Sequence, residues 1–119
     1  MISLHFTEKE LKCPCCGQNH VTKEILEVAE YLRAQCGPLK VHSGYRCTAH
    51  NKAVGGSPRS QHMLGRALDI SSPTFTPLKL YQLIKRHWTL GQLPTLGGLG
   101  LYSWGVHIDV RRSDTLIIW

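Results

Sequence analysis

The sequence predicts an α+β fold in which helices pack against an antiparallel sheet. Some segments have the apolar periodicity of helices, and others have the short apolar runs of strands. The helical segments are residues 22–35 and 77–88, and the strand-like segments are residues 39–42, 66–70, 97–102 and 106–110. This order of helix, strands, helix and strands is typical of α+β proteins with an antiparallel sheet.

The first helix is predicted from an apolar stripe along one side of residues 22–35. The stripe consists of Ile25, Leu26, Val28, Ala29 and Leu32. Gly37 and Pro38 follow the last turn, where these residue types usually end a helix. A short strand at residues 39–42 comes next and leads into a polar segment that begins at Ser43.

The second half of the chain contains a long loop, a helix and a hairpin. Residues 47–61 are polar and rich in Gly, Ser and Asn, which predicts a loop, and loops of this length in a compact domain are usually functional. Pro77 suits the first turn of the second helix. Residues 97–102 and 106–110 resemble two strands joined by a short turn, so they predict a β-hairpin.

Length and charge limit the possible classes of protein. The 119 residues suffice for one domain with a single core, residues 1–119, and an apolar content of 42% is ordinary for a globular protein. The net charge of +6 favours an anionic partner. The Lys and Arg residues are scattered rather than striped, so we expect no nucleic acid partner. We also expect a monomer that does not bind a membrane.

The N-terminal segment predicts where the protein is made. Residues 1–8 have neither a basic nor an apolar region, so they do not resemble a signal peptide. No apolar run approaches the length that spans a membrane. We therefore expect synthesis in the cytoplasm, followed by release if the protein acts elsewhere.

Three residues are candidate ligands of one metal ion. His62 and Asp69 are too far apart to share one helix face, but a loop residue and a strand residue can converge on one ion. His107, in a second strand, would complete the set across the sheet. Imidazole and carboxylate are ordinary zinc ligands, and three protein ligands leave a fourth position for water. The alternative is that these are unrelated polar residues on loops and strand ends.

The residues around these candidates resemble a known family. The motifs are Ser43-Gly44-Tyr45-Arg46, Asn51, Val54-Gly55-Gly56, Ser60-x-His62-x-x-Gly65-x-Ala67-x-Asp69-Ile70 and Val106-His107-Ile108-Asp109-Val110-Arg111. In this order and spacing they resemble the D-alanyl-D-alanine carboxypeptidase family of zinc peptidases, whose fold is shared with Hedgehog signalling domains. The similarity extends from about Phe6 to Arg111, and it is to the short phage and bacterial members that cut peptidoglycan peptides.

The resemblance implies roles for individual residues. It places Zn²⁺ on His62, Asp69 and His107, and it matches Arg46 to the arginine that binds substrate and helps to stabilise the oxyanion. A surface ion pair or a loop anchor is the alternative role for Arg46. Ser60 is expected to orient the loop or to hydrogen-bond behind the ligands.

The resemblance also implies a function. The substrate would be a peptidoglycan stem peptide or cross-link, cut by a carboxypeptidase or endopeptidase in lysin-like degradation of the cell wall, either after release from the cell or from a virion. The alternative is a catalytically inactive zinc-binding module of the same fold, such as a virion structural protein. The sequence does not indicate which peptide bond is cut.

The general base is not evident from the motifs. Some family members carry an acidic residue three positions before the last histidine ligand, where this chain has Trp104. Others carry a histidine two positions before it, where this chain has Gly105. Asp109 is the best substitute, because on a strand it shares a face with His107. Other candidates for proton transfer or oxyanion contact are His42, His50 and Tyr102.

Asp109 has a second possible role. Its carboxylate can instead orient a ligand histidine, or pair with Arg46 or Arg111, without touching the reacting water. The sequence slightly favours this orienting role, because a strand neighbour often points past a metal ion. Both roles remain open at this point.

The cysteines suggest part of a second metal site. Five cysteines are an odd number, so at least one thiol is free unless it pairs between chains, which favours a reducing compartment. Cys13-Pro14-Cys15-Cys16-Gly17, with His20, looks like half a zinc knuckle, but no second CxxC pair exists. Cys36 and Cys47 can complete a site only if the fold brings them close. We expect buried structural thiols or an adventitious disulfide rather than a second metal ion.

Overall fold

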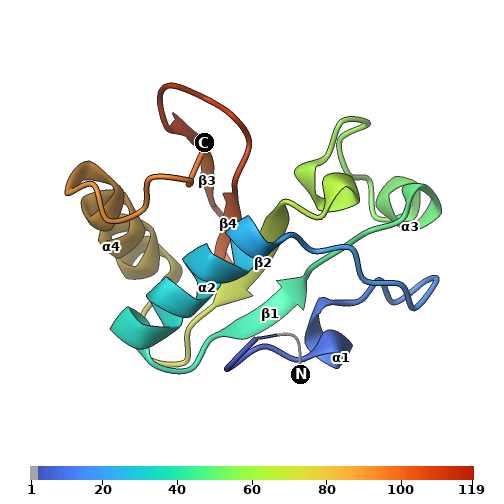
Figure 1. Ribbon diagram of the computed structural model, residues 1–119, viewed down its shortest axis with the longest axis horizontal. Coiled ribbons are helices and arrows are strands. Elements are labelled where there is room, and N and C mark those ends of the chain that lie inside the picture. The colour runs from blue at the N-terminus through green and yellow to red at the C-terminus, as the bar shows by residue number, and fades with distance from the viewer. Residues whose placement is uncertain (1–2) are drawn as a thin grey trace.

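The computed structural model describes residues 3–119, so the first two residues of the predicted domain lie outside it. The helices are α1 (Glu8–Leu11), α2 (Lys23–Cys36), α3 (Thr48–Ala53) and α4 (Pro77–Thr89), together with a 3₁₀ helix, η1 (Gln61–Leu64). The strands are β1 (Lys40–Ser43), β2 (Ala67–Ser71), β3 (Gly98–Leu101), β4 (Val106–Asp109) and β5 (Ile117–Ile118). Figure 1 shows α2 lying across the sheet, with α4 and α3 toward opposite ends of the molecule.

The strands form one sheet in the order β1-β2-β4-β3-β5. The pairs among β1, β2, β4 and β3 are antiparallel, which confirms the α+β class and the predicted hairpin of β3 and β4. The edge strand β5 runs parallel to β3, so the sheet is mixed rather than purely antiparallel. Because β5 has only 2 residues, it shows no periodicity in the sequence.

The two long helices occupy the predicted segments. Helix α2 begins after Thr22, whose side chain accepts a hydrogen bond from the Ile25 amide, and ends at Gly37 with φ of 77°. The predicted apolar stripe of α2 is buried throughout. Helix α4 begins at Pro77 as predicted, and it ends one residue after the predicted boundary.

Besides η1, two short α-helices were not predicted. Helix α3 lies inside residues 47–61, where a loop was expected, and the Cys47 sulfur caps it by accepting a hydrogen bond from the His50 amide. Cysteine is not among the usual capping residues, so the sequence carried no start signal there. Helix α1 has a capping box formed by Thr7 and Glu10, but its 4 residues are too few to show helical periodicity.

The two faces of the sheet have different chemistry because side chains alternate along each strand. On one face, the apolar residues of β2 and β4 join the helices in the core. These residues are Leu68, Ile70, Val106 and Ile108, and they pack with Ile25 and Leu32 of α2 and with Leu80 and Ile84 of α4. Each fully buried side chain of this kind contributes about 1.5–3 kcal/mol. The opposite face carries the alternate residues of the same strands, which include Asp69, His107 and Asp109.

Candidate metal centre

His62 is positioned by the short helix η1. The hydroxyl of Ser60 accepts a hydrogen bond from the His62 amide at 3.2 Å, and this capping contact orients the first turn, as expected for Ser60. Gly65 ends the helix in the left-handed region, with φ of 70°. A Cβ at Gly65 would overlap the backbone carbonyl of His20, so glycine is required both for the conformation and for the close approach.

Asp69 and His107 are brought together by the sheet. They are directly opposite each other in the antiparallel pair of β2 and β4, so their side chains leave the same face as neighbours. The Oδ1 atom of Asp69 lies 2.9 Å from Nδ1 of His107 and 3.1 Å from Nε2 of His62. The three side chains are buried, and one donor atom from each lies within 4.8 Å of the others.

The outer hydrogen bonds of the two histidines determine which ring nitrogens face Asp69 with a lone pair. Nδ1 of His62 donates its proton to the carbonyl oxygen of Gly44 at 2.7 Å, so Nε2 is left as an acceptor. Nε2 of His107 lies 2.8 Å from the Asp109 carboxylate, which accepts its proton and leaves Nδ1 as an acceptor. Such outer partners are typical of histidines that bind metal ions.

This arrangement fits a metal ion. Two imidazole nitrogens and one carboxylate oxygen converge within about hydrogen-bond distance, and such acceptors repel each other unless a proton or a metal ion lies among them. His62, Asp69 and His107 can therefore bind a metal ion. Nitrogen and carboxylate donors in this number are compatible with a site that keeps a further position open.

The ionisation of the site favours a cation. Burial raises the pKa of Asp69, but interactions with the His107 and His62 rings, which become hydrogen bonds when the facing nitrogens are protonated, outweigh burial and hold that pKa far below its usual range. Burial likewise opposes ionisation of Asp109, yet contacts with His107 and Arg111 lower its pKa to about 2. Burial lowers the pKa of His107, but hydrogen bonds to Asp109 and Asp69 outweigh it and raise that pKa. Both carboxylates are thus charged at neutral pH.

Arg46 lies beside the three donors. Its Nη2 donates to the second carboxylate oxygen of Asp69 at 3.2 Å, while Nε donates to Ser43 and Nη1 to Asn51. Only 15% of the Arg46 side chain is exposed, so these contacts hold the guanidinium in one place. The fixed cation can orient Asp69 and present positive charge to a ligand in the adjacent pocket.

Asp109 lies on the far side of His107 from Asp69. Its side chain is fully buried, and its Oδ2 accepts from Nε2 of His107 and, at 2.6 Å, from Nη2 of Arg111. Its Oδ1 accepts from Nε and from the backbone amide of Arg111 at 2.9 and 3.1 Å. A Cβ at Gly98, the cross-strand neighbour on β3, would overlap this carboxylate, so glycine leaves the space that it occupies.

A pocket of about 690 Å³ opens over the three donors. Three arginines line it, Arg46, Arg59 and Arg111. Three aromatic residues, Tyr102, Trp104 and Trp119, also line it. Tyr102 stacks on Trp104 with 5.2 Å between ring centroids, and Trp119 lies 5.1 Å from the ring of His107. The pocket therefore combines positive charge with flat apolar surfaces.

Comparison with known families identifies the chain. A family model described as Peptidase M15 matches residues 4–109, which is nearly the whole chain. The chain belongs to the peptidase M15 family. This confirms the resemblance to the zinc peptidases of the D-alanyl-D-alanine carboxypeptidase type, and with the buried donor set it makes the protein a metallopeptidase of that family. A search of curated proteins gives no match to the chain.

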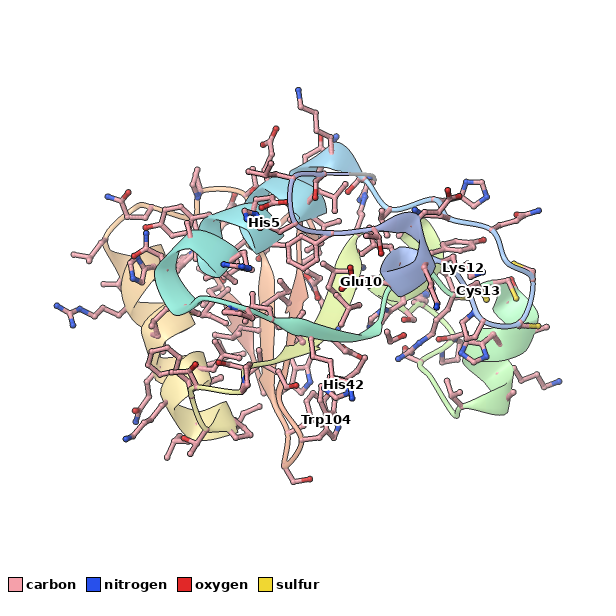
Figure 2. The ribbon with its side chains drawn as sticks, turned by 90° about the horizontal axis from the view of Figure 1, so that it is seen from below. His5, Glu10, Lys12, Cys13, His42 and Trp104 are labelled. Atoms are coloured by element: carbon pink, nitrogen blue, oxygen red, sulfur yellow. The ribbon has the colours of Figure 1, made fainter. Side chains whose placement is uncertain are left out.

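Of the three other sequence candidates for proton transfer or oxyanion contact, only Tyr102 lies at the pocket of this M15 site. Tyr102 lines the pocket, and its hydroxyl accepts a hydrogen bond from Nε1 of Trp119. Neither His42 nor His50 is among the pocket-lining residues of the described chain. His42 instead contacts Ser71 and the ring of Trp104, and Figure 2 shows His42 and Trp104 side by side.

Several residues of the site were not identified from the sequence. Arg59 and Trp119 lie outside the motif positions singled out in the sequence and reach the pocket only through the fold. Gln61 is a further case, because its Oε1 is buried without a hydrogen-bond partner in the described chain and the residue lines the pocket. A polar residue adjacent to a candidate ligand is the only sequence signal that pointed to Gln61.

No helix in the described part of the chain is both long and apolar enough to cross a membrane.

Proposed function

We propose that this M15 peptidase is a zinc enzyme that hydrolyses peptide bonds in peptidoglycan stem peptides or cross-links, in a lysin-like role at the cell wall. The observation that carries the proposal is the pocket over His62, Asp69 and His107, which three arginines line. Among the described residues that line it, Asp69 is the only one with a side-chain carboxylate. Stem peptides are rich in free carboxylates, so their charge complements this pocket.

His62, Asp69 and His107 would hold the zinc ion. When bound, zinc in such a site polarises a carbonyl and lowers the pKa of its water to about 7. The Gly44 carbonyl and the Asp109 carboxylate keep both imidazoles in the tautomer that binds metal. Asp109 is in this view a positioning residue, because both of its oxygens are engaged by His107 and Arg111.

The other pocket residues would bind and orient the peptide. The Arg46 guanidinium, fixed beside Asp69, would stabilise negative charge on the carbonyl oxygen under attack. Arg59, which is exposed at the pocket wall, would bind a substrate carboxylate. The unpartnered Oε1 of Gln61 would accept a hydrogen bond from a substrate amide.

The test compares purified, zinc-loaded protein with variants on isolated peptidoglycan. We expect release of amino groups by the wild type, none by His107→Ala, and wild-type release by His20→Ala, whose exposed histidine lies outside the pocket. Mass spectrometry of the products from purified muropeptides then identifies the bond that is cut. Equal and negligible release by the wild type and His107→Ala would refute the enzymatic function.

A second candidate function is a zinc-binding module without activity. The observation in its favour is that the described pocket residues offer no side-chain carboxylate, apart from that of the ligand Asp69, that could accept the proton of a bound water. This candidate predicts that the wild type binds zinc at the three donors, that His107→Ala loses this zinc, and that neither protein releases amino groups.

A further inference from the structure

Four of the cysteines gather at a second place, away from the pocket. Cys13, Cys15 and Cys16 lie on the turn that follows α1, and Cys47 caps the first turn of α3. The sulfur atoms of Cys13, Cys16 and Cys47 lie within 4.8 Å of one another, although Cys47 is 34 residues from Cys13 in the chain. Figure 2 shows Cys13 at the end of the molecule where the N-terminal turn approaches α3.

The sulfur separations match a thiolate metal site. Four thiolates around zinc at about 2.3 Å form a tetrahedron whose edges are about 3.8 Å. The Cys13 and Cys47 sulfurs are 3.7 Å apart, and all five cysteines of the chain are free thiols in the structure. A disulfide would require about 2.05 Å between the two sulfurs. The cluster therefore has the spacing of metal ligands.

The Cys13 sulfur lies in an environment that stabilises a thiolate. Burial raises the pKa of this thiol, but hydrogen bonds from the backbone amides of Cys47, Cys16 and Cys15 outweigh burial and lower it to about 7. The Cys47 amide donates to the Cys13 sulfur at 3.4 Å. The turn itself is held by the Gly17 amide, which donates to the Cys13 carbonyl at 2.8 Å. Backbone hydrogen bonds therefore hold the Cys13 sulfur in its place beside Cys47.

Cys15 is the next thiol beside this cluster, between Cys13 and Cys16 on the same turn. The neighbouring Cys47 side chain raises the pKa of the Cys15 thiol, and the Cys16 sulfur lies within 4.8 Å of the Cys13 and Cys47 sulfurs. Cys15 and Cys16 are exposed, which contradicts the expectation that these thiols are buried structural groups. Exposed thiols beside other thiols have no packing role that would explain their position.

We propose that Cys13, Cys16 and Cys47, with Cys15 as the fourth ligand, form a structural site for a zinc ion that is separate from the His62, Asp69 and His107 centre. Binding would release the thiol protons and close a tetrahedral site with no open position. The ion would join the N-terminal turn to α3. This connection matters for the pocket because Arg46 immediately precedes Cys47, and the neighbouring Tyr45 amide already donates to the Leu11 carbonyl at 2.9 Å.

The first test is the number of zinc ions bound per chain, measured by elemental analysis after purification under reducing conditions. We expect two ions in the wild type, one in Cys47→Ser, one in His107→Ala, and none in the double variant. Cys36→Ala is the matched control and should retain two, because Cys36 is buried in the core cluster at the end of α2. Cys16→Ser, at an exposed position, repeats the test should Cys47→Ser fail to fold.

The second test identifies the ligands by spectroscopy. Cobalt in the protein should give a thiolate-to-metal charge-transfer band that persists in His107→Ala and disappears in Cys47→Ser. Cys15→Ser should weaken this band and the affinity for zinc, whereas His50→Gln, three residues after Cys47 on α3, should change neither. One zinc ion in the wild type that is retained in Cys47→Ser, or two ions in both Cys47→Ser and Cys16→Ser, would overturn the site. Loss of zinc in His50→Gln but not in Cys15→Ser would overturn the role of Cys15. Failure of this site leaves the proposed peptidase function untouched.

Discussion

Replacing Asp109 by Asn separates a positioning role of this carboxylate from a direct role in proton transfer. Four donor groups meet the two carboxylate oxygens, from Nε2 of His107 and from Nη2, Nε and the backbone amide of Arg111. Asparagine offers one oxygen and one NH₂ group, so it cannot accept from all four donors. If the NH₂ group faces His107, the ring must take the tautomer whose Nδ1 carries a proton, and Nδ1 is then unable to bind a metal ion.

The magnitude follows from the loss of this buried contact. Removing the outer partner of a metal-binding histidine typically weakens metal affinity about 10–100-fold, which corresponds to about 1.4–2.8 kcal/mol. The affinity of the His62, Asp69 and His107 centre for zinc is measured by competition with a chelating dye. Using the Cys16→Ser background confines the measurement to this centre. The same loss should appear as a smaller rise in melting temperature on addition of zinc.

The control is Asp114→Asn, which makes the same charge change at an exposed residue, and it should retain wild-type zinc affinity. If Asp109→Asn binds zinc as tightly as the wild type but loses hydrolysis, Asp109 acts on the reaction itself and the positioning role is wrong. If both zinc affinity and hydrolysis are unchanged, the hydrogen bond to His107 has no functional role.

Three other predictions test the pocket, the sheet and the N-terminal segment. Arg46→Gln should reduce hydrolysis of muropeptides about 10²–10³-fold while zinc stays bound, and unchanged kcat would exclude the oxyanion role. Gly98→Ala should lower the free energy of unfolding by about 1–3 kcal/mol and weaken zinc binding, because the added Cβ overlaps the Asp109 carboxylate. In the control Gly91→Ala, the added Cβ meets no atom within 4 Å, so zinc affinity should be unchanged. Burial raises the pKa of Glu30, but hydrogen bonds from Ser3 and His5 outweigh burial and lower it. The ionised Glu30 therefore stabilises the folded protein above the unfolded pKa of about 4.3, and this contribution is lost as the pH falls through the lower folded pKa. Glu30→Gln should therefore cost about 1–3 kcal/mol in urea unfolding at pH 7 and much less below pH ~4, whereas the exposed Glu27→Gln should cost under about 1 kcal/mol at either pH.

Much of the fold was predictable because its signals are local. The stripe of α2, the proline of α4 and the apolar runs of the hairpin depend only on residues a few positions apart, and each predicted element is present. The missed elements lack such signals. Helix α3 is capped by a thiol, and β5 is recognisable only by its pairing with β3.

The candidate site shows the same division. The motifs and the family resemblance singled out His62, Asp69, His107 and Arg46 by residue type and order, and the fold brings all four together. The contacts of Asp109 with His107 and Arg111 were one of two possibilities in the sequence, because strand alternation gives the face of a side chain but not its direction on that face.

The sequence by itself determined the α+β class, the resemblance of the motifs to one zinc peptidase family and the candidate set of metal donors. Only the tertiary structure decided which ring nitrogens are free to bind a metal ion, that Trp119 and Arg59 reach the pocket, and that Cys47 meets the N-terminal thiols. The physical reason is that secondary structure depends on neighbours in the chain, whereas a donor set depends on strand register and on contacts between residues that are tens of positions apart.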